Sequence, residues 1–124
     1  MPRNMSFSMT TEAVRNRTKT VTRRLGWDFL KPGDLLMACE KCQGLKKGEK
    51  VKRLGLIRVR SVHYESLNTI FDDDPGETTL EGFPGMSQYD FVEMFCKANR
   101  CHEDDACNRI EFEYVPLPDI EGET

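Results

Sequence analysis

The segment from residue 110 to residue 115 alternates apolar and acidic side chains almost to its end. Successive side chains of a β-strand point to opposite faces of the sheet, so Ile110, Phe112 and Tyr114 are expected to face the core. A sheet with one buried and one solvated face is typical of antiparallel and mixed architectures. This strand therefore indicates a fold built on such a sheet.

Short strands and short helices alternate along the rest of the chain. Further strands are predicted at 4–8, 19–24, 35–39 and 54–64, the last with a β-bulge near Gly55. Helices are expected to begin near Thr10 or Thr11, at Ser66 and at Ser87. Loops are expected at 31–34, 43–50 and 72–76. The order predicts an α+β fold, a small mixed or antiparallel β-barrel with short helices at its rim.

At 124 residues the chain has the length of one domain and is too short for two, because separate cores need roughly 100 residues each. A single domain is expected over 1–124, with a core at about 4–115 and an irregular tail at 116–124. No run approaches the ~20 apolar residues that cross a bilayer, and no apolar segment follows the first charged residue, as a secretory signal would require. We therefore expect a cytoplasmic protein that does not enter a membrane.

Basic and acidic residues are divided between the two halves of the chain. Residues 1–60 contain 15 Lys and Arg against 5 Asp and Glu, whereas residues 61–124 contain 3 against 16. A basic surface attracts polyanions such as RNA, because bound phosphates release their counterions. Charge balance does not say where side chains lie in space, so mutual neutralisation of the two halves within the fold is an equal alternative.

Lys19, Thr22 and Arg24 lie within six residues of one another, directly after the first expected helix. Together they offer a point charge, a hydroxyl that both donates and accepts, and a planar guanidinium fork. Such a set suits an anion or a nucleotide. The alternative is a solvated basic strand, because lysine and threonine are common on exposed strands.

The spacing Lys19-x-x-Thr22-x-Arg24 resembles the signature Gly-x-Lys-x-x-Thr-x-Arg of ASCH domains, which belong to the PUA-like superfamily. The resemblance extends to segments similar to that family's Pro-Gly-Asp turn, central strand and acidic loop, at 31–36, 58–62 and 81–83. It covers about residues 4–115.

Position 17 departs from the signature, because Arg stands where the family has Gly. We expect Asn16 to supply the left-handed turn that this glycine implies. The larger Arg17 side chain is expected to fill or reshape the mouth of the cleft.

The resemblance implies a barrel with a cleft lined by Lys19, Thr22, Arg24 and Glu81, in a superfamily known for binding RNA and modified bases. Some small ASCH proteins are amidohydrolases that act on acetylcytidine. In that case Lys19 would take the proton of Thr22, Thr22 would attack the amide carbonyl, and Glu81 would pass a proton to the leaving amine. Such a lysine needs a lowered pKa, which burial or the neighbouring Arg23 and Arg24 would provide. For Glu81 the alternative is a loop carboxylate without a catalytic role.

Cations and one aromatic residue around the motif are the candidates for nucleic-acid or nucleotide binding: Arg17, Arg23, Arg24, Trp27, Lys46 and Lys47. Aromatic rings commonly stack on the bases of single strands, which suggests this role for Trp27 and Tyr89. Packing at the core or rim is the alternative for both rings. The lysines of the 41–60 segment would surround the cleft and attract a phosphate backbone.

An odd number of cysteines in a cytoplasmic chain argues against a disulfide framework. Cys39 and Cys42 have the spacing that lets two thiolates bind one Zn²⁺, and Cys96 and Cys101 are the expected second pair of a structural site. His102 or Cys107 would be substitutes within that pair. The alternative is that these thiols are small buried hydrophobic groups.

Three functions follow from these observations. The first is a PUA-like module that binds RNA or a modified nucleotide, and the second is an amidohydrolase that uses Lys19, Thr22 and Glu81. The third is a small regulator that binds a protein partner through acidic residues at 72–74 and 103–105.

Overall fold

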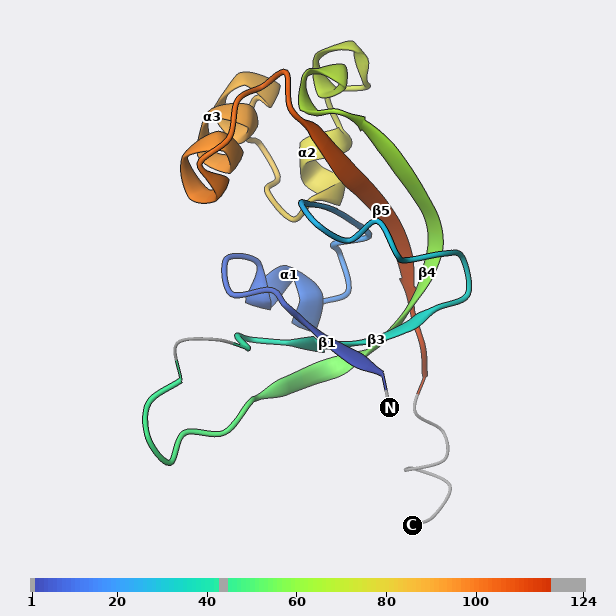
Figure 1. Ribbon diagram of the computed structural model, residues 1–124, viewed down its shortest axis with the longest axis vertical. Coiled ribbons are helices and arrows are strands. Elements are labelled where there is room, and N and C mark those ends of the chain that lie inside the picture. Colours follow the sequence, from blue (N-terminus) through green and yellow to red (C-terminus); the bar gives the residue numbers. More distant parts are fainter. Residues whose placement is uncertain (1, 43–44, 117–124) are drawn as a thin grey trace.

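The computed structural model describes residues 2–42 and 45–116 (Figure 1). Its elements are β1 (Arg3–Ser6), α1 (Thr11–Arg15), β2 (Val21–Arg24), β3 (Leu35–Cys39), β4 (Arg53–Ser66), the 3-10 helix η1 (Leu67–Asp72), α2 (Glu77–Leu80), α3 (Gln88–Asn99) and β5 (Ala106–Tyr114). All the predicted strands and helices are present. The additional helix, α2, has four residues, too few to give a helical period in the sequence.

The five strands form one mixed sheet in the order β1-β3-β4-β5-β2. β1 and β3 run parallel, and the other neighbouring strands run antiparallel. The long strands β4 and β5 bend, so the sheet curls into a half-barrel with α2 and α3 at one end (Figure 1). This confirms the predicted α+β class. The barrel stays open, because β1 and β2 share no ladder within the described residues.

Two register shifts explain how β4 follows the curled sheet. Between β3 and β4 the register shifts beside Gly55, where Leu54 is an extra residue. Between β4 and β5 it shifts again, and Arg60 is the extra residue. An extra residue bends its strand and increases the local twist. The first shift confirms the bulge expected near Gly55.

Two hydrophobic clusters form the core. One lies inside the curled sheet and contains Met5, Phe7, Val14, Leu30, Leu36, Ala38, Ile57, Val59, Ile110 and Phe112. The other lies under η1 and α3 and contains Leu67, Ile70, Phe91, Val92, Phe95 and Cys107. The predicted inward face of the last strand is confirmed, since Ile110 and Phe112 are buried and Tyr114 packs against the first cluster.

Helix α3 begins and ends as its sequence indicates. The Ser87 hydroxyl accepts a hydrogen bond from the backbone N–H of Asp90 at 3.0 Å, which satisfies one of the free donors of the first turn. The helix ends where Arg100 adopts a left-handed conformation, with φ of 52°.

Among the described residues, no helix is both long and apolar enough to cross a membrane.

The turn after α1 differs from the expectation. Asn16 is right-handed, with φ of −83°, and Arg17 takes the left-handed conformation, with φ of 61°. The residue at the signature's glycine position therefore has the backbone shape that glycine favours, even though a Cβ makes it costly. The Arg17 guanidinium lies 5.9 Å from the centre of the Tyr114 ring.

Opposite charges from the two halves of the chain meet in the folded domain. Lys19 and Arg23 pair with Glu81, and Arg58 pairs with Glu113 across neighbouring strands. The pair of Arg58 and Glu113 forms because β5 lies beside β4, whereas Glu81 reaches Lys19 and Arg23 from the end of α2. Mutual neutralisation, which was one of the two alternatives, therefore accounts for part of the charge division.

Candidate functional site

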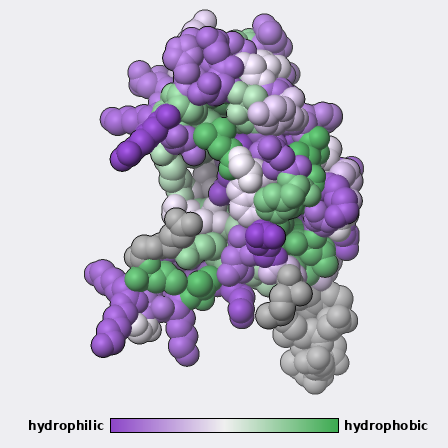
Figure 2. Space-filling model, in the orientation of Figure 1, coloured by the Kyte–Doolittle hydropathy of each residue, from purple (hydrophilic) through white to green (hydrophobic). Residues whose placement is uncertain are grey.

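A cleft of about 210 Å³ lies between the edge strands β1 and β2 on one side and α3 on the other. Its lining comprises Ser6, Phe7, Ser8, Met9, Thr10, Lys19, Thr22, Arg23, Arg24, Glu81, Phe83, Met94, Phe95, Ala98 and Asn99. Figure 2 shows this side of the molecule hollowed, on the left, between the upper part with α3 and the lower part with β1 and β3. The cleft thus occupies the seam at which the half-barrel stays open.

Lys19 lies at the floor of the cleft and is 2% exposed. Its Nζ donates to the backbone carbonyl of Glu81 and to the Glu81 carboxylate, 3.2 Å away at Oε1. The Tyr114 hydroxyl donates to the Lys19 carbonyl at 2.6 Å and so holds the backbone at this position. Burial lowers the pKa of Lys19, and Arg24 and Arg23 add to this effect, while Glu81 opposes it.

Glu81 is held from the opposite side by Arg23, whose Nη1 donates to Glu81 Oε2 at 2.7 Å. The Arg23 side chain is fully buried, and its Nη2 also pairs with Glu77 at 2.7 Å and Asp73 at 3.3 Å. Arg109 joins the same network through two hydrogen bonds to Glu77. The guanidinium of Arg23 is therefore engaged by three carboxylates and holds Glu81 in place from the side opposite Lys19.

Arg24 is fixed in a different way. Its Nε donates to the Thr22 hydroxyl at 3.0 Å and its Nη2 donates to the Ser6 carbonyl at 2.5 Å, so its side chain bridges β2 to β1. The guanidinium also lies over the Phe7 ring, 4.8 Å from its centre. Burial lowers the pKa of Arg24 to about 10, because the charged form loses its hydration.

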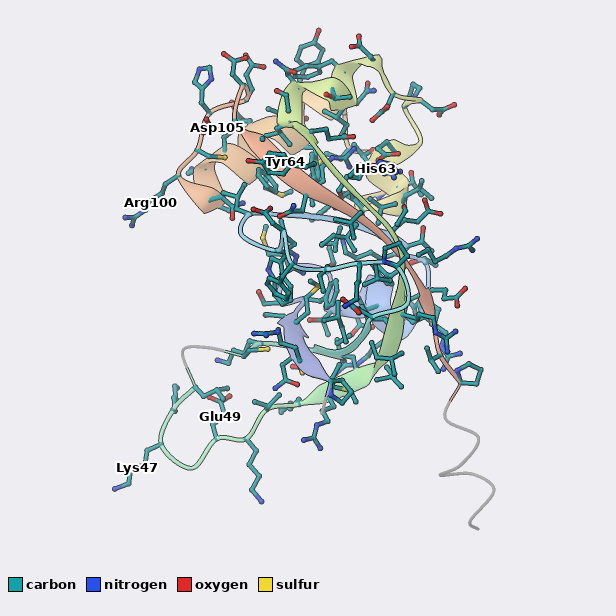
Figure 3. All side chains as sticks on the ribbon, turned by 45° about the vertical axis from the view of Figure 1, so that its right-hand side comes forward. Lys47, Glu49, His63, Tyr64, Arg100 and Asp105 are labelled. Atoms are coloured by element: carbon teal, nitrogen blue, oxygen red, sulfur yellow. The ribbon has the colours of Figure 1, made fainter. Side chains whose placement is uncertain are left out.

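The other predicted binding residues lie outside the cleft. Trp27 packs beside Phe29, with ring centres 5.3 Å apart, and lines a second hollow next to the cleft. Arg17 is exposed and lies against Tyr114, so it does not reshape the mouth of the cleft. Lys46 and Lys47 are exposed on the loop between β3 and β4, and Figure 3 shows Lys47 pointing away from the body of the protein.

Among the described residues, the four predicted zinc ligands do not gather at one centre. Burial raises the pKa of the Cys39 thiol to about 11, with a contribution from Cys42, and burial likewise raises the pKa of the Cys96 thiol to about 11, with a contribution from Cys101. Within residues 2–42 and 45–116, no three His, Cys, Asp or Glu side chains gather into a group that could hold a metal ion. The structure therefore does not bring the four thiols to one centre, and zinc binding stays a prediction.

The acidic runs make local contacts. Asp73 pairs with Arg23, Asp104 accepts a hydrogen bond from the Asn68 amide at 3.0 Å, and Asp105 accepts one from the backbone of His102. These contacts order the loops around η1. Binding of a protein partner through them stays a prediction.

The motif at 19–24 does not indicate two features of the site. The first is the wall that α3 provides, where Met94, Phe95, Ala98 and Asn99 face the cleft. The apolar spacing along α3 predicts a buried face but not which cavity that face borders. The second is the ion-pair network behind Glu81, in which Arg23 pairs with both Glu81 and Glu77, and Arg109 pairs with Glu77. These residues have no motif of their own in the sequence.

No family model and no curated protein matches the sequence. Solved structures match the fold, among them the following two. Protein EF3133 from Enterococcus faecalis V583, described with the family model DUF984, has a TM-score of 0.64 and 17% identity over 93% of this chain and 80% of that chain. The hypothetical protein PH0355 has a TM-score of 0.61 and 17% identity over 93% of this chain and 100% of that chain. This likeness shows the fold alone, which is PUA-like, as the sequence resemblance implied.

Proposed function

We propose that the chain binds a single nucleotide unit, free or within RNA, with its base in the cleft. One observation supports this above all: Lys19, Thr22, Arg24 and Glu81 converge on the same cleft. The four come from two segments nearly sixty residues apart in sequence. Such convergence is the usual mark of a binding site, whereas a solvated basic strand would spread these groups over a surface.

The shape of the cleft favours a base. Drug-sized ligands typically occupy pockets of roughly 300–1,000 Å³, so a cleft of about 210 Å³ suits one smaller group. Its apolar lining includes Phe7, Phe83 and Phe95, which suit the flat faces of a ring. The polar residues lie together, as the polar edge of a base requires.

The polar groups retain hydrogen-bonding capacity for a ligand. The Thr22 hydroxyl accepts from Arg24, which leaves its own proton to donate. Lys19 has three N–H groups and directs two of them to Glu81. The remaining N–H and O–H donors would bond to acceptors on the polar edge of a base, and the Glu81 carboxylate would accept from its donors. Every base presents both kinds of group on such an edge.

The test is a titration of nucleosides, including cytidine and acetylcytidine, followed by the fluorescence of Trp27, the single tryptophan. Thr22→Val keeps the side-chain shape and removes the hydroxyl, so we expect about three- to tenfold weaker binding. Thr18→Val, at an exposed threonine, is the matched control and should bind as the native chain does. A cleft that accepts no nucleoside or nucleotide, or a Thr22→Val variant that binds normally, would contradict the proposal.

If the nucleotide belongs to RNA, the exposed lysines contribute at long range. Affinity for a short RNA should then fall steeply with salt, because bound phosphates release counterions. Replacing Lys46 and Lys47 by Glu should weaken RNA binding and leave nucleoside binding unchanged. A salt-independent affinity would argue for a free nucleotide.

The second candidate is an amidohydrolase acting on an acylated nucleoside such as acetylcytidine, and the lowered pKa of buried Lys19 favours it. Neutral Lys19 would accept the Thr22 proton while the Thr22 oxygen forms a bond to the amide carbonyl carbon. The carbon–nitrogen bond would then break, and Glu81 would pass the proton from Lys19 to the leaving nitrogen. Water would hydrolyse the resulting threonine ester, which releases the acid and restores the hydroxyl.

Turnover is followed by the change in ultraviolet absorbance when acetylcytidine loses its acetyl group. Thr22→Val and Lys19→Met should each abolish turnover if the proposed roles hold, and Thr18→Val should retain it. If the protein binds acetylcytidine but releases no acetate, the amidohydrolase function is contradicted and only the binding function remains. Turnover that persists in Thr22→Val would exclude threonine as the nucleophile.

A further inference from the structure

We propose that the hollow beside the cleft binds the phosphate of the nucleotide whose base occupies the cleft. The ligand would then be a phosphorylated nucleotide unit in preference to a free nucleoside. This inference rests on the proposed nucleotide binding and adds to it a second, anion-specific subsite.

The second hollow has a volume of about 480 Å³ and adjoins the cleft. Its lining comprises Asn4, Ser6, Ser8, Arg24, Trp27, Lys41 and Cys42. Ser6, Ser8 and Arg24 also line the cleft, so these residues form the boundary between the two spaces. A ligand with its base in the cleft therefore has a direct path into the second hollow across the Arg24 guanidinium.

The charge of the second hollow is positive. Its lining residues include Arg24 and Lys41 and no Asp or Glu. Among the described residues, no carboxylate lies within ion-pair distance of Arg24, whereas Arg23 next to it pairs with several. Arg24 is half-buried, and charges that are withdrawn from water in proteins are normally paired. An anionic group of a ligand would supply the partner that the described residues do not.

The Arg24 guanidinium is also held in place before any ligand arrives. Its hydrogen bonds to the Thr22 hydroxyl and the Ser6 carbonyl fix its plane across the open seam. A fixed, planar donor group suits a phosphate, whose oxygens accept two parallel hydrogen bonds. A bound anion would stabilise the charged form of Arg24 against the loss of hydration that burial causes.

Lys41 and Trp27 complete the subsite. The Lys41 ammonium has one loose partner, Glu49 at 3.7 Å, and its side chain is 43% exposed, so it can turn toward an anion at little cost. Trp27 adds a flat wall on which a ribose or a neighbouring base could stack. Two cations, serine hydroxyls and an aromatic wall fit a phosphate monoester or a phosphodiester.

The experiment compares the affinities of cytidine, its 5′- and 3′-monophosphates and the dinucleotide CpC, measured by calorimetry and by Trp27 fluorescence. We expect at least one phosphorylated ligand to bind about tenfold or more tighter than cytidine, since hydrogen bonds to charged groups contribute roughly 1.5–3 kcal/mol. Lys41→Met should remove several-fold of this gain and leave cytidine affinity unchanged. Lys31→Met, at an exposed lysine that lines neither the cleft nor the second hollow, is the matched control and should change neither.

The outcomes separate this inference from the function on which it rests. If cytidine binds and its phosphorylated forms bind no more tightly, the phosphate subsite alone is overturned. The same holds if their affinity exceeds that of cytidine but Lys41→Met leaves the difference intact. A gain with the monophosphates would identify a free nucleotide, and a gain with CpC alone would identify RNA. If cytidine does not bind, pyrophosphate serves as the probe. A change in Trp27 fluorescence that Lys41→Met weakens would then support the phosphate subsite. No change with pyrophosphate would overturn both the subsite and the proposed nucleotide binding.

Discussion

Arg23 and Arg24 are neighbours in β2, yet their guanidinium groups lie in opposite electrostatic surroundings. Arg23 pairs with Glu81, Glu77 and Asp73, whereas no carboxylate among the described residues lies within ion-pair distance of Arg24. The difference arises because neighbouring side chains of a strand point to opposite faces. One arginine therefore holds the acidic side of the cleft together, and the other is available to a ligand.

Removing the charge of Arg23 should destabilise the domain. Arg23→Met removes the guanidinium that the buried carboxylates of Glu81 and Glu77 share and leaves them only Lys19 and Arg109 as partners. Loss of this buried charge is expected to lower the free energy of unfolding by about 3–5 kcal/mol. Urea denaturation followed by Trp27 fluorescence measures this value. Arg58→Met is the control, because Arg58 forms a half-exposed pair with Glu113 that contributes at most about 1 kcal/mol. Equal losses in the two variants would contradict the assigned role of Arg23.

Gly82 should be essential to the position of Glu81. Its φ is 97°, and a Cβ at this position would lie 3.0 Å from a methyl group of Thr10 and 3.2 Å from the Cβ of Ala13. Gly82→Ala is therefore expected to cost more than about 1 kcal/mol of unfolding free energy and to weaken nucleoside binding. Gly85→Ala has a similar φ with no atom within 4 Å, so it isolates the backbone strain. If Gly85→Ala weakens binding as much as Gly82→Ala, the close approach to α1 is not the cause.

Replacing the left-handed residue after α3, Arg100, by glycine should stabilise the domain. Arg100 has φ of 52° at the end of the helix, a conformation that costs residues with a Cβ about 1–2 kcal/mol. Arg100→Gly relieves this strain, but glycine also gives the unfolded chain more conformational entropy, which offsets part of the gain. We therefore expect the free energy of unfolding to rise by about 0.5–1 kcal/mol. Arg17→Gly should gain less, because it also loses the contact with the Tyr114 ring. A fall in stability for Arg100→Gly would contradict this reasoning.

The hydrogen bond from Tyr114 to Lys19 should give stability a pH dependence. Burial raises the pKa of Tyr114 to about 12 from the ordinary value of 10.0, so the neutral phenol stabilises the fold. This contribution is complete below pH 10 and is lost as the pH rises toward 12. Tyr114→Phe should be less stable than the native chain by about 1 kcal/mol at neutral pH, and this difference should shrink between pH 10 and 11. Denaturation at several pH values measures it.

Tyr64→Phe provides the comparison for that pH series. The Tyr64 side chain is 70% exposed, and Figure 3 labels it near the end of β4 that leads into η1. Its replacement should shift stability little and by the same amount at every pH. A difference between Tyr114→Phe and the native chain that stays constant up to pH 11 would show that the phenol contributes only through packing.

Local features of the sequence predicted much of the fold and the centre of the site. The alternation at 110–115 predicted an inward face that is buried, and the Ser87 hydroxyl caps α3 as expected. The spacing of Lys19, Thr22 and Arg24 predicted residues that do line one cleft. These predictions depend on neighbours along the chain, and strand and helix geometry converts such spacing directly into faces.

By itself, then, the sequence determined which segments form strands and helices, which faces are buried, and which residue types gather around positions 19–24. Only the tertiary structure decided that Arg23 turns inward to carboxylates while Arg24 bridges the open edges of the sheet to Ser6. It also decided that Lys46 and Lys47 lie outside the cleft and that the cysteines of the described residues do not gather into one metal-binding group. The physical reason is that an ion pair depends on distances in space between residues far apart in sequence, and those distances are set by the packing of the whole sheet.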